Sequence, residues 1–216
     1  RLVFGGTNND PQTLWFSKGA SYENFAVGTD AADAMVYTIA SNQVNVIRYL
    51  SAKHDLIIGT VGGEFIATSG SINEPITPTN IQIVKQTNYG AANLDALQVE
   101  NVSLFLQRAK RKIREMVYSF DVESYVAPDM TLLAEHITAG GVTQMSYQQE
   151  PDSIIWAIRN DGQLLGLTYQ RNENVIGWHR HIVGGQHNTG KTIAHYFDSF
   201  TANSSTVSTT NNTITV

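Results

Sequence analysis

The sequence contains no cysteine, and this absence excludes several kinds of protein. A disulfide-stabilised scaffold, a thiolate-ligated metal site and a cysteine nucleophile all require that residue. Charged residues are also scarce, at 15% of the 216 residues, whereas 42% are hydrophobic. This composition is unlike that of a disordered chain and supplies enough apolar material for a sizeable core. The sequence therefore predicts a folded protein.

Long hydrophobic runs and a basic charge balance are missing as well. No apolar run approaches the roughly 18 residues of a membrane span, and no signal-peptide pattern is present. The formal net charge of -5 predicts no general affinity of the surface for nucleic acid. The chain begins at Arg1 without a methionine, so we expect a fragment, a processed product or a trimmed chain.

The clearest structural pattern lies in the last third of the chain. Predicted strands at 154–159 and 164–169 flank Asp161-Gly162, a pair typical of tight turns in which both central residues have positive φ. Their β-branched, aromatic and aliphatic residues favour a half-buried sheet. A strand at 142–147 precedes this hairpin and another at 175–182 follows it. We predict a four-stranded antiparallel meander, which is the unit of a propeller blade.

The rest of the chain resembles weaker copies of this unit. Frequent glycine and modest proline, 17 and 5 residues, suit short strands joined by tight turns. Further strands are predicted at 1–4, 12–17, 35–39, 44–50, 56–61, 64–67, 81–84, 103–107 and 113–120. One short helix is predicted at 129–136, with Asp129 as its N-cap. A last hairpin is predicted from 206–210 and 213–216.

A long period connects these strands. Three-residue apolar runs begin at Leu14, Leu56, Leu104 and Ile154, and thus lie 42, 48 and 50 residues apart. Propeller blades repeat every ~40–50 residues, whereas a β-sandwich gives strands at ~8–12-residue spacing without a longer period. We therefore predict an all-β, β-propeller-like domain of about four antiparallel blades at 1–184, small or incomplete, with a β-sandwich as the alternative. The Ser/Thr/Asn-rich residues 185–216 form a separate C-terminal segment.

One segment matches the phosphate-binding loop pattern letter for letter, with Gly185, Gly190, Lys191 and Thr192 at the required positions. In that motif, backbone amides and the lysine bind phosphates and the threonine binds magnesium. The motif also needs a preceding strand, a following helix and later crossovers of a parallel sheet. Only 24 residues follow Thr192, and their single acid, Asp198, lies too close in sequence to hold magnesium from another strand. We interpret the match as a chance feature of a glycine-rich loop.

A pair of histidines is the candidate for a metal site. His179 and His181 lie two residues apart on one face of a predicted strand, with His187 and His195 nearby in sequence. Such a pair can hold zinc if a third ligand converges. The alternative places both on the solvent face of a strand whose buried face carries Ile176, Trp178 and Ile182. Because two histidines alone do not define a coordination geometry, we assign no metal site.

The remaining candidates are a basic turn and the tryptophans. The only basic cluster comprises Arg108, Lys110, Arg111, Lys112 and Arg114. It could contact phosphates or an acidic partner, but such hairpin turns are usually solvated, and no interleaved aromatic residue provides a platform for single-stranded nucleic acid.

Trp15, Trp156 and Trp178 could line a sugar site. We expect strand tryptophans to pack in the core or between blades, and Trp156 to be buried. Many Ser and Asp residues are present but no Gly-x-Ser-x-Gly elbow, and a Ser-His-Asp triad cannot be assembled from the sequence. We therefore predict no catalytic, cofactor-binding or metal site and no enzymatic activity.

A series of segments, taken together and in order, carries a family resemblance. They are LVFGG at 2–6, PQTLWFS at 11–17, YENF at 22–25, ITPTN at 76–80, QTNYG at 86–90, YVAPDMTLLAEH at 125–136, YQQEPDSIIW at 147–156, DGQLLGLTY at 161–169 and GWHRH at 177–181. The combination resembles the propeller region of bacteriophage tail nozzle proteins, also called tail tubular protein B. The resemblance covers 1–184, whereas 185–216 do not continue it.

The resemblance implies a structural protein of the virion tail, with no catalytic site and no cofactor. Members of that family form a ring of identical subunits at the distal end of a short tail. The implied partners are further copies of the chain, the tail adaptor and portal, tail fibre proteins, and genomic DNA that passes without specific binding. An acidic channel wall would repel DNA and let it slide. Two other hypotheses stay open: a carbohydrate-binding propeller and a phosphate-loop nucleotide hydrolase.

Overall fold

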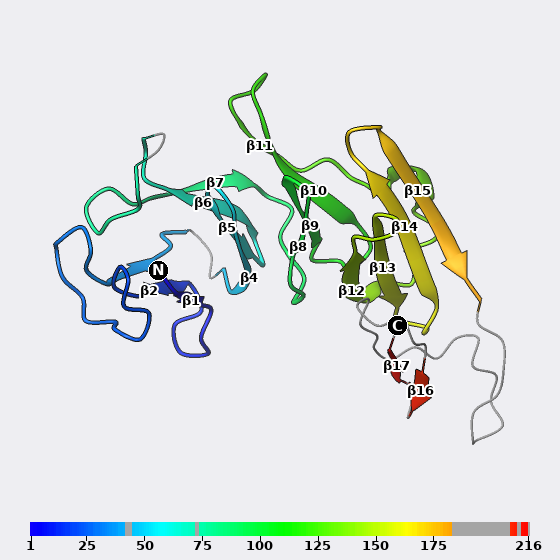
Figure 1. Ribbon diagram of the computed structural model, residues 1–216, viewed down its shortest axis with the longest axis horizontal. Helices are drawn as coiled ribbons and strands as arrows, with labels where there is room; N and C mark the ends of the chain where they lie inside the picture. Colours follow the sequence, from blue (N-terminus) through cyan, green and yellow to red (C-terminus); the bar gives the residue numbers. More distant parts are fainter. Residues whose placement is uncertain (42–44, 72–73, 183–207, 211–212, 216) are drawn as a thin grey trace. The chain divides into compact units, whose positions relative to one another are not determined.

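The computed structural model describes residues 1–41, 45–71, 74–182, 208–210 and 213–215, and this part of the chain is all-β, with no α-helix (Figure 1). It divides into two compact units. Unit 1 comprises Arg1–Ala96 and Val117–Val126, and unit 2 comprises Leu97–Met116 and Ala127–Val216. The predicted domain boundary at 184 stays a prediction.

Unit 1 contains two antiparallel sheets that share one core. The first has the order β1-β2-β3, and the second is the meander β4-β5-β6-β7. Their bounds are β1 Val3–Gly5, β2 Thr13–Phe16, β3 Met35–Thr38, β4 Ile47–Ala52, β5 Leu56–Thr60, β6 Gly63–Thr68 and β7 Gln82–Thr87. Leu14 and Phe16 of β2 pack in one buried cluster with Ile58 of β5 and Phe65 of β6. Burial of these side chains drives the two sheets together.

Unit 2 is built around the meander β12-β13-β14-β15, the clearest blade-like element of the protein (Figure 1). Its strands are β12 Val142–Gln148, β13 Ile154–Arg159, β14 Leu164–Gln170 and β15 Val175–His181. Strands β8 Leu97–Val99 and β9 Val102–Leu106 pair with each other, and β9 also pairs with residues 113–116 of β10 Ile113–Ser119. The rest of β10 belongs to unit 1, where it pairs with β11 Ser124–Val126. Near the C terminus, β16 Ser208–Thr210 pairs antiparallel with β17 Thr213–Thr215.

The apolar period of the sequence corresponds to one sheet per repeat. Leu14 lies in β2, Leu56 in β5, Leu104 in β9 and Ile154 in β13, each the second strand of its sheet. The sheets that carry these runs are successive antiparallel meanders. The predicted all-β fold is thereby confirmed, and the repeat has a structural basis.

A buried carboxylate joins two strands of unit 2. Glu115 of β10 is 5% exposed and accepts a hydrogen bond of 2.7 Å from the Tyr169 hydroxyl of β14. Its other oxygen accepts a 2.7 Å bond from Arg171 Nε. Burial and the hydrogen bond to Glu115 raise the pKa of Tyr169 above its ordinary value. Both carboxylate oxygens are therefore satisfied, as a buried charge requires.

The predicted turn at Asp161-Gly162 is wrong in type. The Arg159 N–H donates to the Gln163 carbonyl at 3.0 Å, which leaves a three-residue loop. Within this loop Gly162 alone has positive φ, at 80°. The Asp161 carboxylate pairs with the Arg159 guanidinium and accepts from the Gln163 N–H. These bonds hold Asp161 in an ordinary conformation and place the glycine at the left-handed position of the loop.

The predicted helix at 129–136 is also wrong. Only a single 3-10 turn, η1 Leu132–Ala134, forms there. Instead of capping a helix, Asp129 accepts hydrogen bonds from Thr131 and pairs with Lys112. Leu132 and Leu133 are 66% and 96% exposed, so the apolar residues of this segment do not form one buried helix face.

Candidate functional site

The polar face of the β12–β15 meander brings together an indole and two imidazoles. Trp156 of β13, Gly166 of β14 and His179 of β15 are cross-strand partners in one row. A Cβ on Gly166 would lie 2.0 Å from His179 Cε1. The glycine therefore leaves the space in which the His179 ring lies across β14.

His181, two residues further along β15 on the same face, contacts His179. His179 Nδ1 lies 2.6 Å from His181 Nε2, and His179 Nε2 lies 3.2 Å from Thr168 Oγ1. The Trp156 ring centroid lies 4.8 Å from that of His181, in an edge-on arrangement, and its Nε1 donates to Gln148 Oε1 at 2.8 Å. Both nitrogens of His179 are thus engaged, and the ring orientation is fixed.

Burial sets the charge of this pair. Burial, and then the neighbouring His181, lower the pKa of His179, and burial lowers the pKa of His181. Both rings therefore favour the neutral form near pH 7. In that form one ring nitrogen donates a hydrogen bond to the other.

Two predictions about this face are wrong. The alternative with solvent-facing histidines and a buried Ile176 fails, because both histidines are half-buried while Ile176 is 48% exposed. The prediction that Trp156 is buried fails as well, because its indole is half-buried. Strand alternation is the reason: Ile155 and Ala157, both fully buried, occupy the core face of β13, and Trp156 lies on the opposite face.

A complete metal-ligand set is not formed here by protein side chains. Among the described residues, no group of three or more His, Asp or Glu side chains is arranged to hold a metal ion. His187 and His195 lie outside the described residues, as does the phosphate-loop match from Gly185 to Thr192. The structure thus brings His179 and His181 together and leaves the other two histidines undescribed.

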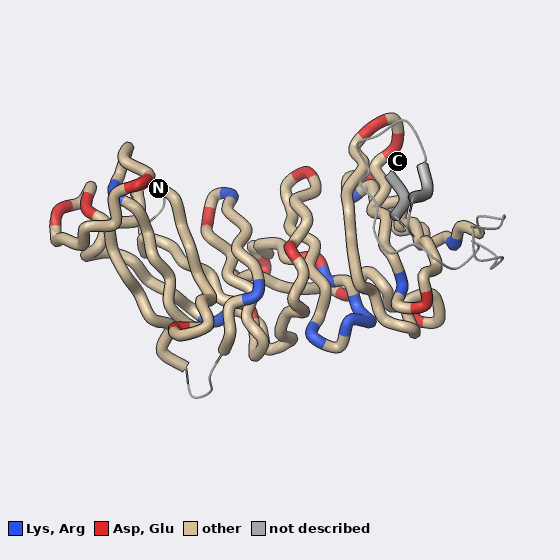
Figure 2. The backbone as a smooth tube through the Cα atoms, turned by 90° about the horizontal axis from the view of Figure 1, so that it is seen from below, with Lys and Arg blue, Asp and Glu red and all other residues tan. Residues whose placement is uncertain are grey.

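The basic cluster separates into neutralised and exposed residues. Lys112 Nζ lies 2.8 Å from carboxylate oxygens of both Asp129 and Glu135, and these contacts raise the pKa of Lys112. Arg114 is only 9% exposed and donates to the Ala127 carbonyl. The exposed members are Arg108, Lys110 and Arg111. The turn is visible in Figure 2 as a run of blue on one loop.

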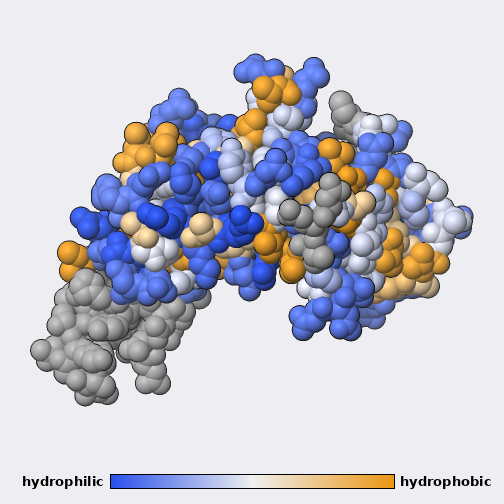
Figure 3. Space-filling model, turned by 180° about the vertical axis from the view of Figure 1, so that it is seen from behind, coloured by the Kyte–Doolittle hydropathy of each residue, from blue (hydrophilic) through white to orange (hydrophobic). Residues whose placement is uncertain are grey.

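An apolar hollow lies at the other face of β15. It has a volume of about 470 Å³, and its lining includes Trp178, whose Nε1 donates to the Met130 carbonyl at 2.8 Å. Leu132 and Ile176 line the same hollow and are 66% and 48% exposed. On the face shown in Figure 3, hydrophobic side chains reach the surface in several groups separated by hydrophilic ones. Exposed apolar area alone therefore does not single out one interface.

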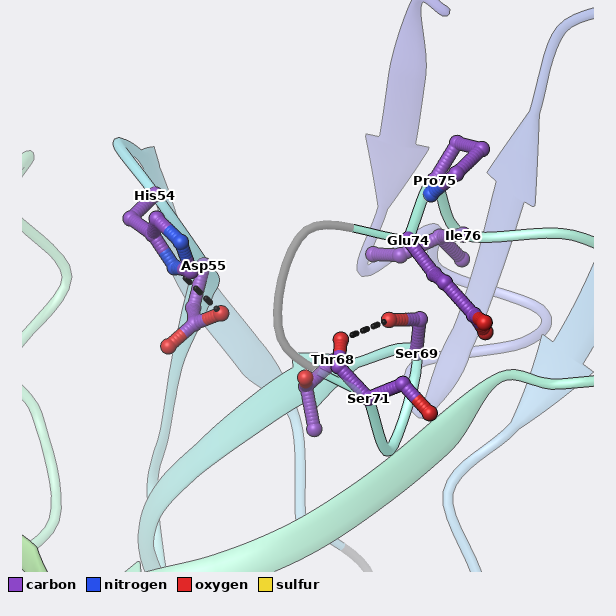
Figure 4. Close-up of a pocket in the computed structure, with 8 residues that line it drawn as sticks. All are labelled: His54, Asp55, Thr68, Ser69, Ser71, Glu74, Pro75 and Ile76. Atoms are coloured by element: carbon purple, nitrogen blue, oxygen red, sulfur yellow. Dashed lines mark hydrogen bonds and ion pairs between the residues drawn. The ribbon is translucent and has the colours of Figure 1, made fainter.

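Unit 1 contains a polar pocket that was not predicted from the sequence (Figure 4). Its volume is about 340 Å³, and His54 and Asp55 line one side of it. Asp55 accepts from the Tyr125 hydroxyl at 2.7 Å and lies 3.2 Å from His54 Nδ1. The Ser69 hydroxyl donates to the Ser71 carbonyl, so it is not paired with the imidazole as a nucleophile would be. Tyr125 lies 70 residues from Asp55 in the sequence, so this contact could not be predicted from residue spacing.

Comparison of the chain with known protein families and with curated proteins found no match. Within the described residues, no helix has the length and apolar character needed to cross a membrane.

Proposed function

We propose that this chain is a structural subunit of a phage tail nozzle, in which its meanders serve as blades of a propeller region. The supporting observation is the succession of antiparallel sheets whose second strands carry the repeated apolar runs. The segment resemblance over 1–184 supplies the biological assignment. The subunit assembles into a ring with further copies of itself, contacts the tail adaptor, portal and fibre proteins, and surrounds the path of the genome.

Charge supports passage of DNA without retention. A wall that neutralised phosphates would release counterions and hold the duplex. The chain has a net charge of -5. Arg108, Lys110 and Arg111 of the basic turn are exposed, whereas Lys112 pairs with Asp129 and Arg114 donates to the Ala127 carbonyl. We expect these three residues to face solvent or a neighbouring subunit, away from the channel axis.

A titration of duplex DNA at moderate salt tests this charge argument, with assembled rings where they form. The test variant replaces Arg108, Lys110 and Arg111 with Ser. The matched control is Lys112→Ser. We expect weak binding by the parent chain and little change in either variant. Tight, strongly salt-dependent binding that is lost in the triple variant would show that the basic turn retains DNA.

Location in the virion tests the assignment itself. Gold-labelled antibody raised against the chain should mark the distal end of the tail in electron micrographs of intact phage. Label on the head, or on no part of the particle, would refute the assignment. A glycan array and an ATP-binding assay examine the two other hypotheses, and a specific, saturable ligand in either would favour that hypothesis instead.

A further inference from the structure

We propose that His179 and His181 form a two-histidine site for a divalent transition-metal ion of the Zn²⁺, Ni²⁺ or Cu²⁺ class, with water completing the coordination. The proposal is independent of the nozzle assignment. It rests on the arrangement of ring nitrogens on the polar face of unit 2, where the two imidazoles already meet.

The separation of the two nitrogens suits a shared ion. His179 Nδ1 and His181 Nε2 lie 2.6 Å apart. An ion with metal–nitrogen bonds of about 2.0–2.1 Å holds two imidazole nitrogens roughly 3 Å apart or slightly more. A rotation of either ring by about half an ångström at the nitrogen therefore exchanges the N–H···N bond for two metal bonds. Imidazole is a favoured ligand for zinc, copper and nickel.

A neighbouring hydroxyl orients the first ligand. Thr168 Oγ1 lies 3.2 Å from His179 Nε2, the nitrogen that does not face His181. With the proton of His179 on Nε2 and donated to Thr168, the lone pair of Nδ1 points toward His181. Metal-bound histidines usually donate their second nitrogen in this way, which fixes the tautomer and the ring plane.

The backbone favours the same geometry. Gly166 leaves the space for the His179 ring, since a Cβ there would lie 2.0 Å from Cε1. His181 supplies its Nε2 lone pair once its proton moves to Nδ1, and the neutral pair then binds the ion without net release of a proton.

The test is a calorimetric titration of the metal-free full chain with Ni²⁺ and, separately, Zn²⁺. Replacement of His187 and His195 by Ala provides a background in which those histidines do not contribute. In that background we expect one ion per chain, with affinity at least tenfold weaker in His179→Ala and in His181→Ala. The exposed His136 supplies the control, and His136→Ala should bind as its parent does.

Two further measurements keep the proposal falsifiable if an alanine variant folds poorly. Gly166→Ala retains both histidines but displaces the His179 ring, and should also weaken binding at least tenfold. Cu²⁺ should quench the fluorescence of Trp156, whose ring lies 4.8 Å from that of His181, and a Trp156→Phe variant should lose that part of the quenching. Unchanged affinity in His181→Ala and Gly166→Ala, or binding that disappears with His187 and His195, would overturn the proposal.

Discussion

The hydrogen bond from Tyr169 to Glu115 offers a sharp test of the core of unit 2. In Tyr169→Phe the aromatic ring keeps its volume, so no large cavity forms, and only the hydroxyl is removed. Glu115 keeps its 2.7 Å bond to Arg171 but loses the 2.7 Å bond to a side chain that is 1% exposed. A hydrogen bond to a charged group contributes about 1.5–3 kcal/mol, and we expect a loss of that size in the free energy of unfolding.

The assay is urea denaturation followed by tryptophan fluorescence in a Trp15→Phe background. The remaining tryptophans, Trp156 and Trp178, both lie in unit 2 and report its unfolding. Tyr147→Phe is the matched control, because its hydroxyl meets the neutral Ser153 Oγ at 3.2 Å and its loss should cost at most about 1 kcal/mol. The midpoint should fall with an unchanged urea dependence. A Tyr169→Phe midpoint equal to that of the parent, or to that of the control, would refute the reasoning.

Further predictions concern the same unit and the phosphate-loop match. Ile155→Ala, at a fully buried position, should lower the free energy of unfolding by about 2–5 kcal/mol, and Trp156→Ala should cost less than the ~3–5 kcal/mol typical of a buried tryptophan, both by urea denaturation. Because its pKa is raised on folding, Tyr169 keeps its proton when the unfolded chain has lost it. Stability should therefore be intact below about pH 10 and fall above it, less steeply in Tyr169→Phe, in midpoints measured across that range. Lys191→Ala should melt as the parent does with or without ATP, and an ATP-dependent rise confined to the parent would contradict this.

The strand pattern was predictable because apolar runs and turns are local features. The runs at Leu56 and Ile154 lie in strands as expected, and the repeat corresponds to the second strand of successive sheets. Strands β8 and β11 were missed, because their formation depends on pairing with β9 and β10. The helix predicted at 129–136 does not form, because the contact of Asp129 with Lys112 outweighs the local helix propensity. Such a contact between distant residues is not visible in the local sequence pattern.

The candidate site was predictable only in part. Residues that are two positions apart on a strand share one face, so His179 and His181 were predicted to lie together. The structure shows them in contact. The role of Gly166 depends on the strand register, which spacing does not define. The exposure of Trp156 was misjudged because β13 carries apolar residues on both faces, so the sequence does not distinguish the core face from the other.

Electron microscopy of the purified protein at high concentration, with its mass measured by sedimentation, tests the nozzle assignment most directly. The account predicts closed rings of identical subunits around a central channel. A uniform population of monomers, with no rings in the micrographs and a sedimentation mass equal to the 23.7 kDa of one chain, would contradict it.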